Sequence, residues 1–156
     1  MRRWLMVGAA LVFPVVGALA LAGTAEAATG VACTKLTGTV NSSDSAKVTI
    51  SGCNDTANTG GSGTTTGNAT ATTGTITWKG TGTTTLGGLT TTVVTPDKCP
   101  GSDLEEMTTG TVTGGTGKAA KSIKKNWTTQ SFVCYNPGNN KLALLKGTKY
   151  QIGPGL

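Results

Sequence analysis

The stretch that decides the fold runs from Cys33 to Cys53 and reads CTKLTGTVNSSDSAKVTISGC. Apolar and polar residues alternate on both sides of its centre, which predicts two β-strands. The centre, residues 41–45, is rich in Asn and Ser and favours a turn. Antiparallel pairing with Leu36 opposite Ile50 keeps the apolar side chains on one face. The same register places Cys33 directly across from Cys53, so we predict a hairpin closed by a disulfide.

Two further cysteines, Cys99 and Cys134, bring the total in the chain to four. No pair has the C-x-x-C spacing of redox or zinc sites, so we expect disulfides. Once Cys33 and Cys53 are joined, elimination leaves a Cys99–Cys134 bridge. Leu, Ile, Val and Phe make up only 20 of the 129 residues from Ala28 onward. Two bridges that each contribute about 2–4 kcal/mol would brace such a thin core.

Residues 1–27 have the three-part layout of a secretory signal peptide. Two arginines form a basic start, an apolar run covers 4–21, and Ala25-Glu26-Ala27 is a small-x-small cleavage site. The alternative is a retained anchor, because the run is about long enough to span a bilayer. We predict cleavage, which leaves 28–156 as a single domain without a membrane segment. Its even number of cysteines favours a secreted protein, extracellular or associated with the cell surface.

Threonine and glycine supply 32 and 24 of the 156 residues. The glycines keep no three-residue period, which excludes collagen. Threonine suits strands because its branched Cβ fits a pleated surface. The chain after the signal divides into about eight or nine short strand-like segments, which predicts an all-β antiparallel sandwich or barrel. Thr-Gly-Thr followed by Val or Ile recurs every 36 residues, at Thr37, Thr73 and Thr109, so a β-trefoil is the alternative.

Two segments give more local expectations. Residues 54–74 contain no side chain larger than Thr apart from Asn and Asp, so we expect a long flexible loop. Residues 82–86 and 89–95 alternate on either side of Gly87-Gly88, which predicts a hairpin that turns at the two glycines. In both segments glycine is interpreted as an interruption of regular structure.

The chain contains no histidine. This excludes any reaction that needs an imidazole base and any histidine-bound metal. The acidic residues at 103–106 fit a solvated turn better than the facing carboxylates of glycoside hydrolysis. We therefore predict a protein that is not an enzyme, with no catalytic, cofactor-binding or metal-binding residues. Both arginines lie in 1–27, so we expect no nucleic-acid partner, since such recognition favours the arginine fork.

A basic segment is the candidate binding site. It contains Lys118, Lys121, Lys124 and Lys125 and leads into Trp127. Positive side chains beside an aromatic ring suit an anionic cell-wall polymer or an acidic glycan. The alternative is a solvated loop that keeps the protein soluble. We predict a non-catalytic secreted domain that binds such a polymer. A structural protein that self-associates through Thr-rich strand edges is the alternative, and the sequence indicates no oligomeric state.

Three short motifs carry resemblances to known families. The alanine-rich leader, Ile50-Ser51-Gly52-Cys53-Asn54 and Lys146-Gly147-Thr148-Lys149-Tyr150 together resemble small secreted four-cysteine β proteins of actinobacteria, which implies export but no particular activity. Lys98-Cys99-Pro100 is similar to the reactive loop of the Streptomyces subtilisin-inhibitor family and would imply a protease inhibitor. Gly101 departs from that family, which places a side chain there for the protease pocket.

Overall fold

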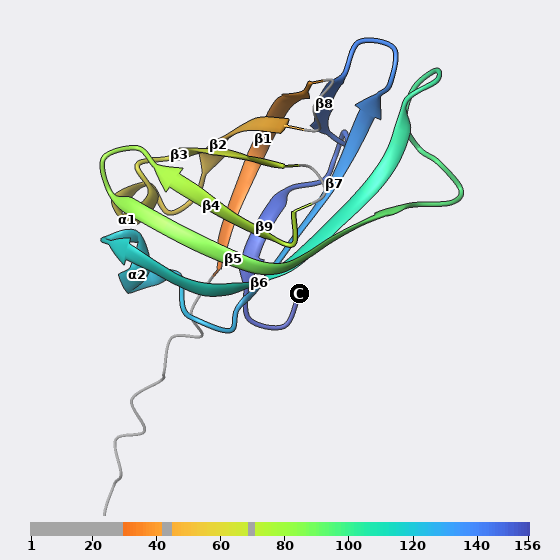
Figure 1. Cartoon of the computed structure of the whole chain (residues 1–156). Coiled ribbons are helices and arrows are strands. Elements are labelled where there is room, and N and C mark those ends of the chain that lie inside the picture. The colour runs from red at the N-terminus through yellow and green to blue at the C-terminus, as the bar shows by residue number, and fades with distance from the viewer. Residues whose placement is uncertain (1–29, 42–44, 69–70) are drawn as a thin grey trace, which may run out of the picture.

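The computed structural model describes residues 30–41, 45–68 and 71–156. The predicted signal peptide, 1–27, therefore lies outside the described residues. Nine strands and two short helices make up the described chain (Figure 1). The strands are β1 (Val31–Val40), β2 (Ser45–Cys53), β3 (Ser62–Asn68), β4 (Thr73–Trp78), β5 (Gly82–Val93), β6 (Leu104–Gly117), β7 (Thr128–Asn136), β8 (Lys141–Leu144) and β9 (Tyr150–Gly153). The helices are α1 (Thr56–Thr59) and α2 (Ala119–Ser122).

The strands close into an antiparallel barrel. Each of β1–β8 pairs with its neighbour in sequence, and β8 pairs back onto β1. β9 pairs with both β1 and β7 and is the ninth strand of the sheet. The predicted all-β class is confirmed, with the barrel as its form. The β-trefoil alternative is wrong, because the strands follow one another around a single closed sheet.

The first hairpin has the predicted register. Leu36 pairs with Ile50 and Gly38 with Val48, and Cys33 lies across from Cys53. Both predicted disulfides are confirmed, Cys33–Cys53 and Cys99–Cys134. Alternation alone was sufficient here, since a slip of one residue would turn every apolar side chain of β2 out of the barrel.

The prediction of a long flexible loop over 54–74 is wrong. Helix α1 begins after Asp55, whose side chain accepts a hydrogen bond from the Asn58 backbone N–H. Strand β3 then pairs with β2 along its whole length and with β4 over three residues. Glycine is required inside this strand: a Cβ at Gly63 would lie 2.8 Å from the ring of Trp78. At Gly63 the missing side chain therefore reflects tight packing and not flexibility. Residues 69 and 70 lie outside the described part of the chain.

The predicted hairpin at Gly87-Gly88 is also wrong. Strand β5 continues through both glycines, and its pairing with β6 shifts register between Thr85 and Leu86 and again between Gly87 and Thr90. Such irregularities bend a strand and change which side chains face inward. In a regular strand Leu86 and Thr91 would point to opposite faces, because they are an odd number of positions apart. Here both line the inside of the barrel. Glycines that look like a turn in the sequence act as a bulge in the closed sheet.

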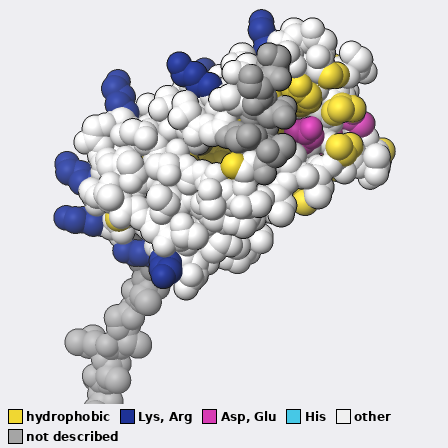
Figure 2. All heavy atoms as spheres, viewed as in Figure 1, with side chains coloured by type: hydrophobic (Ala, Val, Ile, Leu, Met, Phe, Trp, Pro, Cys, Tyr) yellow, Lys and Arg dark blue, Asp and Glu magenta, His cyan; other side chains and the backbone are white. Residues whose placement is uncertain are grey.

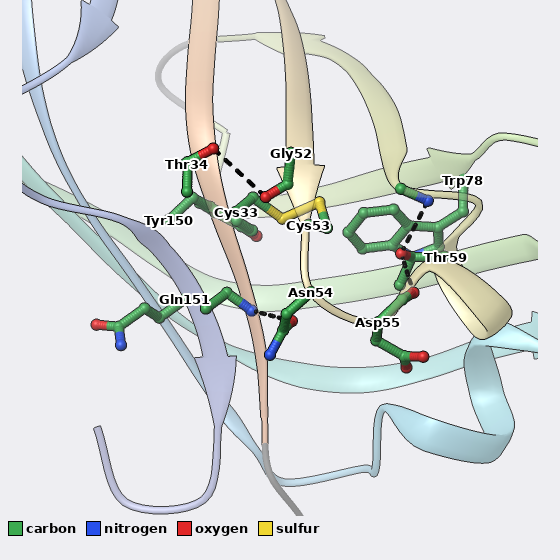
Figure 3. Close-up of a disulfide and its surroundings, with 12 residues drawn as sticks. Cys33, Thr34, Gly52, Cys53, Asn54, Asp55, Thr59, Trp78, Tyr150 and Gln151 are labelled. Carbon is green, nitrogen blue, oxygen red and sulfur yellow. Dashed lines mark hydrogen bonds between the residues drawn. A yellow bond between two sulfur atoms is a disulfide. The ribbon is translucent and has the colours of Figure 1, made fainter.

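One end of the barrel is closed by a packed layer, called the floor here. It is built from the buried side chains of Val31, Trp78, Ala119, Ile123 and Ile152. The Cys33–Cys53 disulfide lies beside Trp78 and Tyr150 (Figure 3). The α1 and α2 helices contact one another at this end of the barrel (Figure 1).

A buried hydrogen bond fixes the largest side chain of the floor. Trp78 is 2 % exposed and its indole Nε1–H donates to Thr84 Oγ1 over 2.8 Å. Thr84 is 1 % exposed, so the pair is shielded from water. A buried indole needs such an acceptor, because an unpaired N–H loses its hydrogen bond to water without replacement.

Candidate functional site: the barrel cavity

The interior of the barrel above the floor holds a cavity of about 640 Å³. All nine strands contribute to its walls. The lining residues are Leu36, Val40, Ala46, Val48, Ile50, Thr65, Gly67, Ala71, Thr73, Gly74, Ile76, Leu86, Leu89, Thr91, Glu106, Thr108, Thr129, Ser131, Val133, Tyr135, Leu142 and Tyr150. An eight-stranded barrel is wide enough either to be filled by its own side chains or to hold one small ligand. This volume lies within the range typical of small-molecule sites.

Small side chains at inward-facing positions leave the space open. Strand β3 presents Thr65 and Gly67 to the cavity, and β7 presents Thr129 and Ser131. A filled barrel would carry large branched residues at such positions. Gly67 lies exposed at the end of β3, and a Cβ added there would meet no atom within 4 Å, so a larger side chain could be accommodated at this position. The Thr- and Gly-rich composition is thus the direct cause of the cavity.

The other end of the barrel from the floor is called the mouth. At the mouth β1, β3, β5 and β7 end and β2, β4, β6 and β8 begin. Two large apolar side chains lie exposed at this end, Val93 at 60 % and Leu104 at 40 %. Figure 2 shows hydrophobic and acidic side chains gathered at one end of the molecule, with lysines spread elsewhere. The mouth therefore has an apolar rim, which favours access by apolar molecules.

The cavity has two chemically different walls. Strands β1, β2, β4 and β8 contribute mainly aliphatic side chains, among them Leu36, Val48, Ile76 and Leu142. Strands β5–β7 contribute the carboxyl group of Glu106 and most of the hydroxyl groups, beside the apolar side chains of Leu86, Leu89 and Val133. On this polar wall Thr91 Oγ1 and Thr108 Oγ1 lie 3.1 Å apart and are hydrogen-bonded across the strands. A ligand in the cavity would meet a mainly apolar surface on one side and a surface with both polar and apolar groups on the other.

Tyr150 is a buried polar residue that lines the cavity. Its hydroxyl lies 2.9 Å from Thr129 Oγ1, which is also hydrogen-bonded to the carbonyl oxygen of Gln151 at 3.0 Å. Burial raises the pKa of Tyr150 to about 12, and the hydrogen bond with Thr129 opposes this only in part. The hydroxyl therefore stays protonated at neutral pH and acts as a neutral hydrogen-bonding group.

Glu106 is the acidic group of the cavity. It lies on β6 near the mouth, between Val93 of β5 and Val133 of β7 in the sheet register. Its side chain is half-buried, and desolvation raises its pKa above the ordinary value of 4.5. Its neighbour Glu105 points to the outer face instead, where it is 1 % exposed and accepts a hydrogen bond of 2.8 Å from the Lys98 backbone N–H.

The connection between β5 and β6, residues 94–103, is fixed to the outside of the barrel. The Cys99–Cys134 disulfide joins it to β7. The side chain of Asn136 donates a hydrogen bond of 2.6 Å to Asp103 Oδ1. Together with the contact to Glu105, these bonds hold the connection against the sheet. The second disulfide thus stabilises a wall of the mouth.

A second hollow lies on the outer surface. Its volume is about 850 Å³, and it runs over the outward faces of β1, β2 and β8. Lys47, Lys98, Lys141 and Lys146 lie along it. This hollow is a surface groove, whereas the barrel cavity is enclosed by strands on all sides. Small-molecule sites bury most of their ligand, so the barrel cavity is the stronger candidate.

The predicted basic segment lies at the floor end of the molecule. Lys118, Lys121, Lys124 and Lys125 are all exposed, and α2 spans only Ala119–Ser122 of the segment. Trp127 is partly buried and packs against the core. The structure therefore places the lysines together on the surface but gives the indole a packing role as well. None of these residues lines the barrel cavity.

Comparison with known protein families, with curated proteins and with solved structures found no match for this chain. Within residues 30–41, 45–68 and 71–156, no group of three or more His, Cys, Asp or Glu side chains is placed to hold a metal ion. The same residues include no helix long and apolar enough to cross a membrane. Two disulfides are consistent with an oxidising extracellular environment.

Sequence reasoning missed the cavity residues, Glu106 above all. A signal was present in β6, where Glu106, Thr108, Gly110 and Val112 occupy alternate positions. Val112 is buried in the core, so the period of two places Glu106 on the same inward face. This pattern indicates a cavity residue only if the sheet is known to close into a barrel. In an open sheet an acidic residue near the end of a strand is ordinarily solvated.

Proposed function

We propose that this protein binds a small, mainly apolar molecule inside its barrel. The observation that carries the proposal is the cavity of about 640 Å³ with walls from all nine strands and a packed floor. Burial of apolar ligand surface in such a space contributes about 25 cal/mol per Å². Together with the predicted export, the site supports a role as an extracellular carrier or scavenger of small molecules.

Binding of N-phenylnaphthylamine tests this proposal, because this uncharged probe becomes strongly fluorescent when it leaves water. We expect saturable binding by the secreted form, residues 28–156, with one probe per chain. The Gly67→Trp variant should bind at least about tenfold more weakly, since the indole would fill space that a ligand's apolar surface otherwise occupies. The absence of steric contacts around a Cβ at Gly67 makes this change compatible with the fold.

Thr66→Trp is the matched control. Thr66 is the exposed neighbour of Gly67 on β3 and does not line the cavity. It should bind the probe as the natural protein does. Linear, non-saturable fluorescence with the natural protein, or equal affinities for the Gly67→Trp variant and the natural protein, would contradict binding inside the barrel.

Polymer binding by the basic segment is a second proposal. It is favoured by the exposure of all four lysines, none of which forms an ion pair with another described residue. A variant with all four changed to Gln should lose retention on purified cell wall and keep the binding of N-phenylnaphthylamine. Equal retention of the variant and the natural protein would contradict this second role.

A further inference from the structure

Glu106 differs from every other described residue that lines the cavity. The remaining lining residues are aliphatic side chains, hydroxyl groups, glycines and tyrosines. None of the 11 lysines in the chain lines the cavity. The exterior of this basic protein would attract anions, whereas the described lining of its cavity presents one carboxyl group. The charge inside the barrel is therefore opposite in sign to the net charge of +6.

The carboxyl group of Glu106 has no partner among the residues that the structure describes. It makes no hydrogen bond and no ion pair with any described residue. Its half-buried position means that water solvates it incompletely. A carboxylate in such a place is destabilised unless an opposite charge or a hydrogen-bond donor approaches it. The raised pKa of Glu106 reflects the same lack of compensation.

The surroundings of Glu106 define where a partner would lie. Thr108 follows on the same inward face of β6 and is hydrogen-bonded to Thr91 on β5. Tyr135 lines the cavity from β7, two positions beyond Val133, which pairs with Glu106. These groups form a polar region near the mouth, and the aliphatic wall of β1, β2 and β4 lies across the cavity from it.

We propose that the barrel selects apolar molecules that carry a protonated amine, with the amine bound to the carboxylate of Glu106 near the mouth and the apolar body against the aliphatic wall. This inference rests on the proposed binding function and names the ligand class. An ammonium group supplies both the opposite charge and the hydrogen-bond donors that Glu106 lacks. Thr108 and Thr91 offer hydroxyl oxygens as further acceptors.

Three probes with one apolar body test the selection: naphthylmethylamine, naphthylmethanol and naphthoate. Their affinities are measured by displacement of N-phenylnaphthylamine. We expect the amine to bind the natural protein about tenfold more tightly than the alcohol, and the carboxylate to bind most weakly. In the Glu106→Gln variant the amine should lose this advantage, and the alcohol should bind as before.

Asp97→Asn is the control for a general effect of charge. Asp97 is exposed on the connection between β5 and β6, outside the cavity, and its Oδ1 accepts a hydrogen bond of 2.7 Å from the Cys99 backbone N–H. Asn keeps that acceptor and removes the same charge as the cavity variant. The amine preference should survive in this control.

The acidity of Glu106 gives a second measurement. Amine affinity should fall as the pH is lowered through the pKa of Glu106, which burial places above 4.5, and alcohol affinity should stay constant. The other titratable groups that face the cavity are Tyr135 from β7 and Tyr150 from β9; β1–β5 and β8 present none. Burial raises the pKa of Tyr150 to about 12, so its hydroxyl stays protonated throughout the acidic range.

The outcomes separate the two proposals. Equal affinities of the three probes, tightest binding of naphthoate, or an amine preference that persists in Glu106→Gln would overturn the selection of amines and leave the binding function intact. Binding of N-phenylnaphthylamine without any binding of the amine would do the same. Failure of all four compounds to bind would overturn the binding function itself.

Discussion

The hydrogen bond between Trp78 and Thr84 offers a sharp test of how the floor is held. Thr84→Val keeps the shape and the strand preference of the side chain and removes the acceptor of the indole N–H. The two side chains are 2 % and 1 % exposed, so no water can replace the lost 2.8 Å bond. We expect the free energy of unfolding to fall by about 1–3 kcal/mol, the cost of an unsatisfied buried donor.

A double-mutant cycle separates this bond from other effects. Trp78→Phe removes the donor and some packing volume, and the combined variant loses both partners of the bond. The cost of the double change should be smaller than the sum of the two single costs by about 1 kcal/mol. Urea unfolding followed by circular dichroism, with both disulfides intact, measures all four proteins.

Thr77→Val is the matched control for this cycle. Thr77 lies next to Trp78 on β4 with its side chain exposed, so the change should alter stability by less than about 0.5 kcal/mol. The reasoning is refuted if Thr84→Val is as stable as the natural protein, or if the single costs add without coupling.

Three further predictions concern the core, the strands and the second disulfide. The pKa of a tyrosine is about 10 in the unfolded chain, and burial raises that of Tyr150 to about 12 in the folded protein. Raising the pH across this interval should therefore lower the free energy of unfolding by about 3 kcal/mol. Urea unfolding measures this loss, which should be absent in Tyr150→Phe. Gly63→Ala should lower the free energy of unfolding by about 1–3 kcal/mol, because the methyl group would lie 2.8 Å from the tryptophan ring, whereas Gly67→Ala on the same strand should not. Replacing Cys99 and Cys134 by Ala should cost about 2–4 kcal/mol and make 94–103 the first site of proteolysis, and an unchanged cleavage pattern would contradict this.

The sequence was most informative where neighbouring strands pair. In 33–53 the alternation, the turn residues and the two cysteines all specify one register, which the structure has. The second disulfide followed by elimination. The predictions failed where glycine suggested an interruption of regular structure. The residues that make glycine necessary at position 63 lie on another strand and are distant in the sequence. Trp78, whose ring occupies the space beside Gly63, is 15 positions further along the chain.

The candidate site could not be predicted in the same way. The cavity exists because Thr65, Gly67 and Ser131 face inward at positions where larger side chains would fill the barrel. Their faces become an interior only because the strands close into a barrel, and closure is not a local property of the sequence. The basic segment around Lys121 was visible in the sequence because charge density is local, and its role as a polymer site stays a prediction.

By itself, the sequence determined the all-β class, the first hairpin and both disulfides, because each depends on short-range alternation or on the number of cysteines. Only the tertiary structure decided that the sheet closes with β8 against β1, that 54–74 contains strand β3, and that the side chains of Glu106 and Glu105 point to opposite faces of the sheet. The physical reason is that a strand's side chains alternate in any sheet, whereas which face becomes an interior is settled only when the last strand pairs with the first.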